Sequence, residues 1–394
     1  NRHMKKKLVR NTSEHFRQIF HEKPEYVFLS PGRINIIGEH VDYNDGYVLP
    51  AAINKYICFA ISRNNSSSCV LHACDMQDTY QFSLDEPVKP VGKSWVNYIL
   101  GVVSQLQEKG FNLRGVNVVF SSTIPMGAGL SSSAALECGY CYAMNSIFHL
   151  GLSKESIAKI GQKSEHNFVG VNCGIMDQFA SVFGKKNKAI RLDCNTLEHD
   201  YHKIDFTGYS LLLLDSKVKH THLTSGYNIR RQEVDKGIGI IRTHYPHVRT
   251  FRDCTKEMVE KLREALGETI YKRCHFVVRE IQRVQDAVQA IERKDFLALG
   301  KLMSETHEGL SKEYEVSCPE LDFLVDAANH EKTVIGSRMM GGGFGGCSIN
   351  LVEKGSEKKL IKLIGEQYKK AFGIKLEAYK IKISDGTRQY REIH

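Results

Sequence analysis

The chain has 394 residues, of which 42% are hydrophobic and 25% are charged, a composition that excludes a disordered protein. This length exceeds what one hydrophobic core usually holds, so we expect two domains. The net charge is +9, but Lys and Arg are scattered rather than gathered in a stripe, so we expect an anionic substrate and no nucleic acid. The longest aliphatic run is Leu211 to Leu214, far below the roughly 20 residues that span a bilayer, so we expect no membrane.

The first half of the chain mixes strand-like and helical patterns. A Pro-Gly turn is expected at 31–32 between two short apolar runs. Ser94 is expected to cap a helix that ends at Gly110, because the apolar residues between them follow a helical stripe. The segments predicted from these patterns are short apolar, strand-like runs at 26–30 and 35–37, strands at 56–62 and 116–120, and helices at 94–110 and 131–148.

The second half is richer in helical patterns. Its predicted segments are strands at 209–214, 347–352 and 376–383, a glycine-rich turn at 341–346, and helices at 256–267, 271–293, 295–309 and 357–371. Strands and helices in this order suggest an α+β domain. We expect the boundary between the two domains near residues 190–205.

The cysteines and the first residues indicate the compartment. Eleven cysteines are widely spaced, and only Cys138 and Cys141 form a close pair. A zinc site needs two such pairs, so we interpret these two as buried free thiols in a reducing compartment. Lys5–Lys7 lead into mixed polar sequence, so we expect no secretory signal and a cytoplasmic protein. Residues 1–3 precede Met4 and are interpreted as an expression remnant.

A glycine and serine loop at 125–137 is the first segment that indicates chemistry. A strand leads into it, its glycines allow close backbone approach, and a helix begins at its serines. The free N–H groups and the positive end of such a helix bind anions, most often phosphate. The loop is not a Walker A motif, because no Lys-Ser/Thr pair ends it. A simple turn with a serine cap remains the structural alternative.

The second segment, 31–44, is dense in short polar side chains. Arg33, Glu39, His40, Asp42 and Asn44 fall within twelve residues beside an apolar run. Such donors and acceptors suit sugar hydroxyls, each of which both donates and accepts a hydrogen bond. A metal site or a solvated loop is the alternative interpretation.

Three further segments carry unusual residues. Asp177 is an acid enclosed by apolar neighbours, which indicates either a cationic partner or acid–base work. The run 341–346 contains five glycines in six residues, so a ligand or another backbone is expected to pass close to it. His220 and His222 lack nearby partners and are interpreted as part of a polar loop.

In this order and at these spacings, the segments around 31–44, 125–137, 173–179 and 338–348 resemble a galactokinase of the GHMP small-molecule kinase superfamily. The resemblance covers about residues 25 to 385, and its most specific mark is the segment 38–44, Gly-Glu-His-Val-Asp-Tyr-Asn. It implies a two-domain α+β GHMP-kinase-like fold with the active site in the interdomain cleft. We place the N-terminal domain at 4–195 and the C-terminal domain at 196–394.

The resemblance also implies roles for individual residues. Asp177 is the base that accepts the proton of the anomeric hydroxyl of D-galactose, and Arg33 stabilises the charge beside it. Ser133 and Glu165 hold Mg²⁺. The implied sugar contacts are Glu39, His40, Val41, Asp42 and Tyr227. The implied contacts to the ATP phosphates are Gly127, Ala128, Gly129, Leu130, Ser131, Ser132 and Ser133. Trp95 is either an adenine contact or a core residue.

Three alternatives stay open at this point. A related sugar 1-kinase, for N-acetylgalactosamine or arabinose, would share the same segments. A non-catalytic galactose sensor is disfavoured, because the residues after the serine run are intact and both Arg33 and Asp177 are present. A dinucleotide oxidoreductase is the weakest alternative, since no acidic ribose reader follows the glycine loop. We expect a monomer, although the sequence leaves an oligomer open.

Overall fold

The computed structural model describes residues 2–92, 94–219 and 223–392. His220 and His222, interpreted above as part of a polar loop, lie outside the described residues. In the first half, the helices and strands are α1 (Arg2–Phe20), β1 (Tyr26–Asn35), β2 (Tyr47–Val48), β3 (Pro50–Arg63), β4 (Ser68–Ala73), β5 (Asp78–Ser83), α2 (Ser94–Glu108), β6 (Val116–Ser122), α3 (Ser132–Phe148), α4 (Lys154–Ser164), α5 (Met176–Phe183), β7 (Lys188–Asp193) and β8 (His199–Lys203).

The second half is mostly helical, as its sequence pattern predicts. Its helices and strands are β9 (Tyr209–Asp215), α6 (Leu223–His244), α7 (Lys256–Lys261), α8 (Arg263–Leu266), α9 (Glu268–Glu292), α10 (Phe296–Lys312), α11 (Pro319–Asn329), β10 (Val334–Met339), β11 (Cys347–Glu353), α12 (Glu357–Phe372), β12 (Glu377–Ile381) and β13 (Arg388–Gln389). Short single turns lie at Asp42–Asn44, Cys74–Met76 and Phe251–Asp253, and a π-helical turn at Glu165–Val169.

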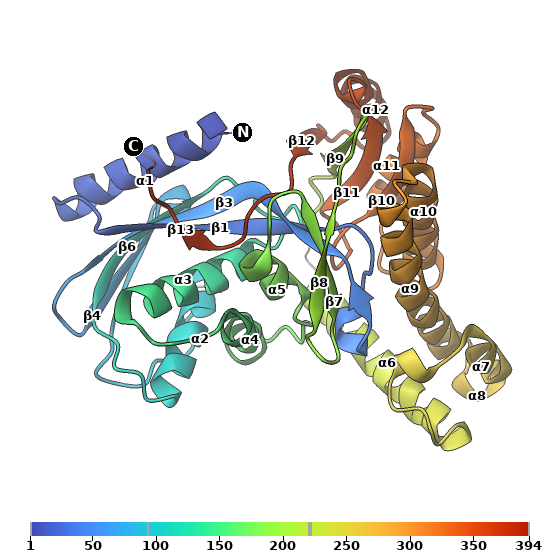
Figure 1. The fold of residues 1–394 in the computed structure, drawn as a ribbon, viewed down its shortest axis with the longest axis horizontal. Helices are drawn as coiled ribbons and strands as arrows, with labels where there is room; N and C mark the ends of the chain where they lie inside the picture. Colours follow the sequence, from blue (N-terminus) through green and yellow to red (C-terminus); the bar gives the residue numbers. More distant parts are fainter. Residues whose placement is uncertain (1, 93, 220–222, 393–394) are drawn as a thin grey trace.

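Three sheets organise these elements. A six-stranded sheet has the order β13-β1-β3-β6-β4-β5, a four-stranded sheet the order β10-β11-β9-β12, and a small sheet the order β2-β7-β8. Helix α1 covers one face of the large sheet, and α2, α3 and α4 lie on the opposite side (Figure 1). The last strand, β13, returns from the second half to pair with β1. Both helices and sheets are present in both halves, which confirms the predicted α+β fold class.

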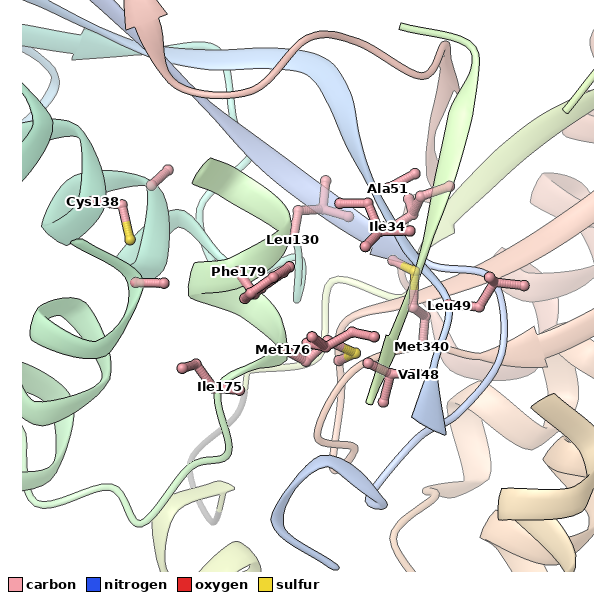
Figure 2. Packing of buried hydrophobic residues seen from close by; sticks show 14 of the residues in the cluster. Ile34, Val48, Leu49, Ala51, Leu130, Cys138, Ile175, Met176, Phe179 and Met340 are labelled. Carbon is pink, nitrogen blue, oxygen red and sulfur yellow. The ribbon is translucent and has the colours of Figure 1, made fainter. Parts of the chain in front are cut away.

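The buried core is continuous between the two halves. Met340 belongs to the second half, yet it lies in the same cluster as Ile34 and Val48 of the first (Figure 2). Phe179 of α5 and Leu130 of the glycine and serine loop belong to this cluster as well. Because these side chains exclude water from the junction, the polar residues next to them are held in fixed positions.

The main difference from the sequence prediction is at Pro31. We predicted a turn at 31–32, but β1 runs straight through these residues and pairs with β3 on both sides of them. The register shifts between Pro31 and Arg33. Such a bulge accommodates a proline in a strand, because the missing N–H then falls where the ladder is already interrupted.

The predicted helices are confirmed with small changes in their ends, except that 256–267 is divided into α7 and α8. Among the described residues, no helix is both long enough and apolar enough to cross a membrane. All eleven cysteines are free thiols, and Cys138 and Cys141 are buried, as predicted.

Candidate active site

A cavity of about 330 Å³ lies between segments from both halves of the chain. Its walls come from the end of β1, the turn after it, the loop before α3, the loop before α5, helix α6 and the glycine-rich turn. The predicted site residues that line it are Arg33, Glu39, His40, Asp42, Gly127, Gly129, Leu130, Ser131, Ser132, Ser133, Glu165, Asp177 and Tyr227. The structure therefore brings thirteen of the fifteen predicted residues to one cavity.

The N-terminus of α3 forms one end of this cavity. Gly127 and Gly129 have φ of +72° and +78°, and Ser131 has φ of +60°, so the loop turns sharply before α3 begins at Ser132. Left-handed backbone is accessible to glycine at little cost, which explains the glycines here. The first-turn N–H groups have no partner within the helix, and the helix dipole places positive charge at them. This end of the cavity can bind an anion such as phosphate.

Arg33 and Asp177 form an ion pair inside the cavity. Arg33 Nε donates to Asp177 Oδ1 at 2.6 Å, and its Nη1 donates to the Gly129 carbonyl at 2.9 Å. The Arg33 side chain is 4% exposed, whereas that of Asp177 is 33% exposed and faces the cavity. Burial alone would lower the pKa of Arg33, but the negative charges of Asp177 and Glu39 hold it above its ordinary value. A fixed cation therefore lies between the carboxylate and the anion-binding loop.

Glu39 joins the turn after β1 to the glycine-rich turn. Its Oε1 accepts from Arg338 Nη1 at 3.0 Å and from the Gly341 N–H at 3.1 Å. Arg338 is fully buried and also donates to the Ile36 carbonyl at 3.1 Å. Burial raises the pKa of Glu39, and the guanidinium groups of Arg338 and Arg33 act in the opposite direction. Oε1 of Glu39 is thus used to hold the two turns together.

The hydrogen bonds of His40 determine its tautomer. Its Nε2 lies 2.9 Å from the Gly342 carbonyl, which can only accept, so Nε2 carries the proton. Burial lowers the pKa of His40 to about 4, so the ring is neutral and Nδ1 accepts from the Tyr43 hydroxyl at 2.8 Å. The Tyr43 oxygen in turn lies 2.5 Å from the Tyr314 hydroxyl, which must therefore donate to it. With both ring nitrogens occupied, His40 is not available as a metal ligand.

Asp42 is a buried carboxyl group whose pKa is raised toward neutral pH. Its Oδ1 accepts from the Tyr43 N–H at 3.1 Å and its Oδ2 from the Met176 N–H at 3.4 Å. Burial and then the negative charge of Asp177 raise the pKa of Asp42 to about 7. A Cβ on Gly174 would lie 2.2 Å from Asp42 Oδ2, so only glycine permits this approach.

Ser133 and Glu165 offer oxygen ligands beside the anion-binding loop. Ser133 Oγ donates to Glu165 Oε1 at 2.8 Å, and both residues line the cavity. Burial raises the pKa of Glu165, while hydrogen bonds with Glu137 and Ser133 counter that effect. No group of three or more His, Cys, Asp or Glu that could hold a metal exists among the described residues. A hydroxyl and one carboxylate fit Mg²⁺, which keeps several waters and takes its remaining ligands from substrate phosphates.

Family models match the chain in three places. A model described as the GHMP kinases N terminal domain matches residues 97–185, and the GHMP kinases C terminal model matches 287–370. A galactokinase galactose-binding signature matches residues 14–63, which include the turn with Glu39, His40 and Asp42. These matches cover the turn with Glu39, His40 and Asp42, the anion-binding loop at 127–133, and part of the helical second half.

Similar proteins decide the family. A galactokinase from Thermotoga petrophila is 44% identical over 360 residues, which are 91% of this chain and 99% of that protein. The chain belongs to the galactokinase family. A galactokinase from Clostridium acetobutylicum is 36% identical over 386 residues, 97% of this chain and 99% of that protein. The family membership confirms the resemblance seen in the sequence and identifies the protein as a kinase.

Solved structures agree with this family. The crystal structure of Lactococcus lactis galactokinase complexed with galactose has a TM-score of 0.92 and 32% identity, covering 95% of this chain and 98% of that one. The Methanococcus jannaschii mevalonate kinase has a TM-score of 0.65 at 19% identity, covering 91% and 98%. The second likeness concerns the fold alone. The N- and C-terminal GHMP kinase models together with the first structure confirm the predicted two-domain GHMP-kinase-like fold.

Two predicted residues of this galactokinase-family site do not line the cavity. Val41 is fully buried, and its carbonyl accepts from the Gly46 N–H at 2.9 Å. Ala128 is fully buried too, and its carbonyl accepts from the Cys347 N–H at 3.0 Å. Both residues shape the turns that carry their neighbours.

Trp95 belongs to the core, the second of the two interpretations given to it. Its Nε1 donates to Asp78 at 2.8 Å, and its ring packs against Phe120. The sequence interpretation missed Tyr98, Val169 and Val171 as cavity residues. Tyr98 lies on the apolar stripe of α2, where the residues around it belong to the hydrophobic core. The sequence therefore holds no signal that distinguishes a cavity residue at this position from a core residue.

The glycine-rich turn needs its glycines for close packing. A Cβ on Gly343 would lie 2.1 Å from the Val316 carbonyl oxygen, and one on Gly345 would lie 2.5 Å from that of Val218. Both residues have positive φ, +97° and +148°. The predicted close approach of another backbone is confirmed, and Gly341 and Gly342 of the same turn face the cavity.

Proposed function

We propose that this member of the galactokinase family transfers the γ-phosphoryl group of ATP to the anomeric hydroxyl of D-galactose, giving α-D-galactose 1-phosphate and ADP. The observation that carries this proposal is the Arg33–Asp177 ion pair at 2.6 Å, which also reaches the Gly129 carbonyl of the anion-binding loop. It links a carboxylate that can accept a proton with the place where phosphates would bind. A sugar hydroxyl beside Asp177 would therefore face the terminal phosphate of ATP.

We assign the sugar subsite to Glu39, His40, Asp42 and Tyr227. Their side chains line the same cavity, the Tyr227 ring packs against that of His40, and the turn that carries the first three residues matches the galactose-binding signature. Carboxylates accept from hydroxyl groups, and such charge-assisted hydrogen bonds are stronger than neutral ones. Val41 would contribute through its backbone position, because its side chain is buried away from the cavity.

We assign the phosphate subsite to the loop from Gly127 to Ser133. Its backbone N–H groups and the N-terminus of α3 would bind the phosphate oxygens of ATP. Ser133 and Glu165 would hold Mg²⁺, which supplies positive charge that offsets the charge of the phosphates when it is bound. Ala128 keeps the loop in place through its buried side chain and its bond to Cys347.

The proton transfer follows from the ion pair. As the bond from the anomeric oxygen to phosphorus forms, that hydroxyl becomes more acidic, and the Asp177 carboxylate can accept its proton. Arg33 lies beside Asp177 and stabilises the negative charge that spreads over the phosphoryl oxygens. Phosphoryl transfer depends mostly on positioning and charge stabilisation, which these two side chains provide together.

Three further assignments are proposals of the same kind. The division into domains at 4–195 and 196–394 is supported by the change from the large sheet to the helical half, although β8 and β13 lie beyond it and pair with strands of the first half. A cytoplasmic location is supported by the eleven free thiols. A monomer remains the expected assembly.

The test is ADP release by the purified protein with ATP, Mg²⁺ and galactose, compared with the Asp177→Asn variant. Asn keeps the shape of the side chain but cannot accept the proton, so kcat is expected to fall by at least ~100-fold, the usual contribution of a positioned base. ATP binding is expected to change little. A parent protein that binds both ligands without releasing ADP would show the sensor function instead, and an active Asn variant would remove Asp177 from the mechanism.

A further inference from the structure

Helix α6 contributes Tyr227 to the cavity wall and holds the loop that precedes α5. Asn172 lies on this loop and is exposed. Its N–H donates to Asn228 Oδ1 at 3.3 Å, and its carbonyl accepts from Arg231 Nη1 at 2.8 Å. Asn228 and Arg231 are three positions apart on α6, so they lie one turn apart on the same side of the helix. Both backbone groups of one loop residue are therefore bound by the second half of the chain.

The Arg231 guanidinium also contacts the turn after β1 that carries His40 and Asp42. Arg231 Cζ lies 5.6 Å from the centroid of the Tyr43 ring, within the range of a cation–π contact. Tyr43 in turn donates to His40. Tyr227, four positions before Arg231 on α6, lines the cavity and packs its ring against those of His40 and Tyr43. Arg231 thus joins α6, the loop at 170–174 and the turn with His40.

The position of this loop matters for the sugar end of the cavity. Two residues after Asn172, Gly174 approaches the Asp42 carboxylate so closely that a Cβ would not fit. The Met176 N–H then donates to the same carboxylate, and Asp177 follows at once. A shift of the loop would therefore move the Met176 N–H that Asp42 accepts, whereas Asp177 is also held by its ion pair with Arg33. The anion-binding loop is a separate segment and would stay in place.

We propose that Asn228 and Arg231 form a clamp on Asn172 that sets the affinity for the sugar and leaves the affinity for ATP unchanged. This inference rests on the proposed galactokinase function of the cavity. Both residues act as positioning residues, because they hold the backbone of the loop and do not themselves line the cavity. The first half of the chain holds the adjacent residue of the loop, since His166 Nε2 lies 2.7 Å from the Cys173 carbonyl.

The test uses variants of α6 in the full chain. Arg231→Met keeps an unbranched, flexible side chain and removes its donors, and Asn228→Ala removes the other contact. Each is expected to raise the KM and the Kd for galactose about five- to tenfold, the effect of losing one partly exposed hydrogen bond. The KM for ATP, the kcat at saturating galactose and the Tm are expected to stay close to those of the parent. Arg231→Lys, which keeps one donor, is expected to recover part of the loss.

Ile229→Ala is the matched control, because Ile229 lies on the same turn of α6 and is 49% exposed. It is expected to behave like the parent. Amide exchange over 170–174 adds a readout of loop position, and it is expected to quicken in Arg231→Met.

The outcomes separate the two proposals. No ADP release by the parent with galactose would refute the proposed function. An active parent whose Arg231→Met variant keeps the galactose KM, or loses affinity for both substrates together with a lower Tm, would refute the clamp. If Arg231→Met fails to fold, Asn228→Ala and Arg231→Lys decide by the same criteria.

Discussion

Replacing Asp42 with Ala or Asn is expected to separate sugar recognition from a structural role. In the free protein the Asp42 carboxylate accepts N–H groups from Tyr43 and Met176 while it lines the cavity. A charge-assisted hydrogen bond to a sugar hydroxyl is worth roughly 1.5–3 kcal/mol. Asp42→Ala is therefore expected to lower kcat/KM for galactose by on the order of 10- to 150-fold. The KM for ATP is expected to change little.

The pH dependence follows from the pKa of Asp42, which is raised to about 7, first by burial and then by Asp177. The carboxylate form accepts hydrogen bonds, so the parent's kcat/KM for galactose is expected to rise between pH 6 and pH 8. Asp42→Asn cannot ionise and is expected to lose that rise while keeping the shape of the side chain. A parent profile that is flat across this range would contradict the assignment.

The contribution of Asp42 to folding stability changes with pH in the opposite direction to kcat/KM, and it serves as the control. The folded pKa of Asp42 is above its ordinary value of 3.8, so protonation favours the folded state and this contribution is lost as the pH rises through about 7. Asp42→Asn is therefore expected to be at least as stable as the parent at pH 8, measured by Tm. We expect glucose to lose less kcat/KM than galactose in Asp42→Ala. Equal losses for both sugars together with a lower Tm in both variants would show that Asp42 only supports the turn.

The remaining predictions concern separate parts of the molecule. Ser133→Ala and Glu165→Ala each remove one of the two proposed oxygen ligands, so half-maximal activity is expected to need more Mg²⁺; titration curves that match the parent's would place the metal elsewhere. Trp95→Phe is expected to lower the free energy of unfolding by about 1 kcal/mol through the lost bond to Asp78, without changing the KM for ATP. A raised KM for ATP at unchanged stability would instead show that Trp95 contacts the adenine of ATP. Gly343→Ala is expected to lower the Tm, because its Cβ would meet the Val316 carbonyl.

The local motifs could be predicted because the residues that define each of them lie close together in the sequence. Glycines followed by serines before an apolar helix predict the loop at 127–133, and the structure places this loop directly before α3. The long amphipathic helices α9 and α12 were also predicted close to their observed ends. In each case the signal comes from residues within one or two turns of each other.

Other features depend on tertiary contacts and could not be predicted. Helix α6 carries Tyr227, but Gly226, Gly237 and Gly239 within it weaken its helical pattern. A Cβ on Gly226 would lie 2.5 Å from the Phe344 ring and one on Gly237 would lie 2.3 Å from Cys274 Sγ, so packing decides that these positions are glycine. Likewise the Glu39–Arg338 bond joins residues 299 positions apart, which no local pattern reveals.

The most direct test of the account measures which sugar accepts the phosphoryl group and at which hydroxyl. ADP release is measured over galactose, glucose, N-acetylgalactosamine and arabinose, and the product is identified by ³¹P–¹H coupling in NMR spectra. The account predicts the highest kcat/KM for galactose and a phosphate coupled to the anomeric proton. A higher kcat/KM for another sugar, or a phosphate on any other carbon of galactose, would contradict it.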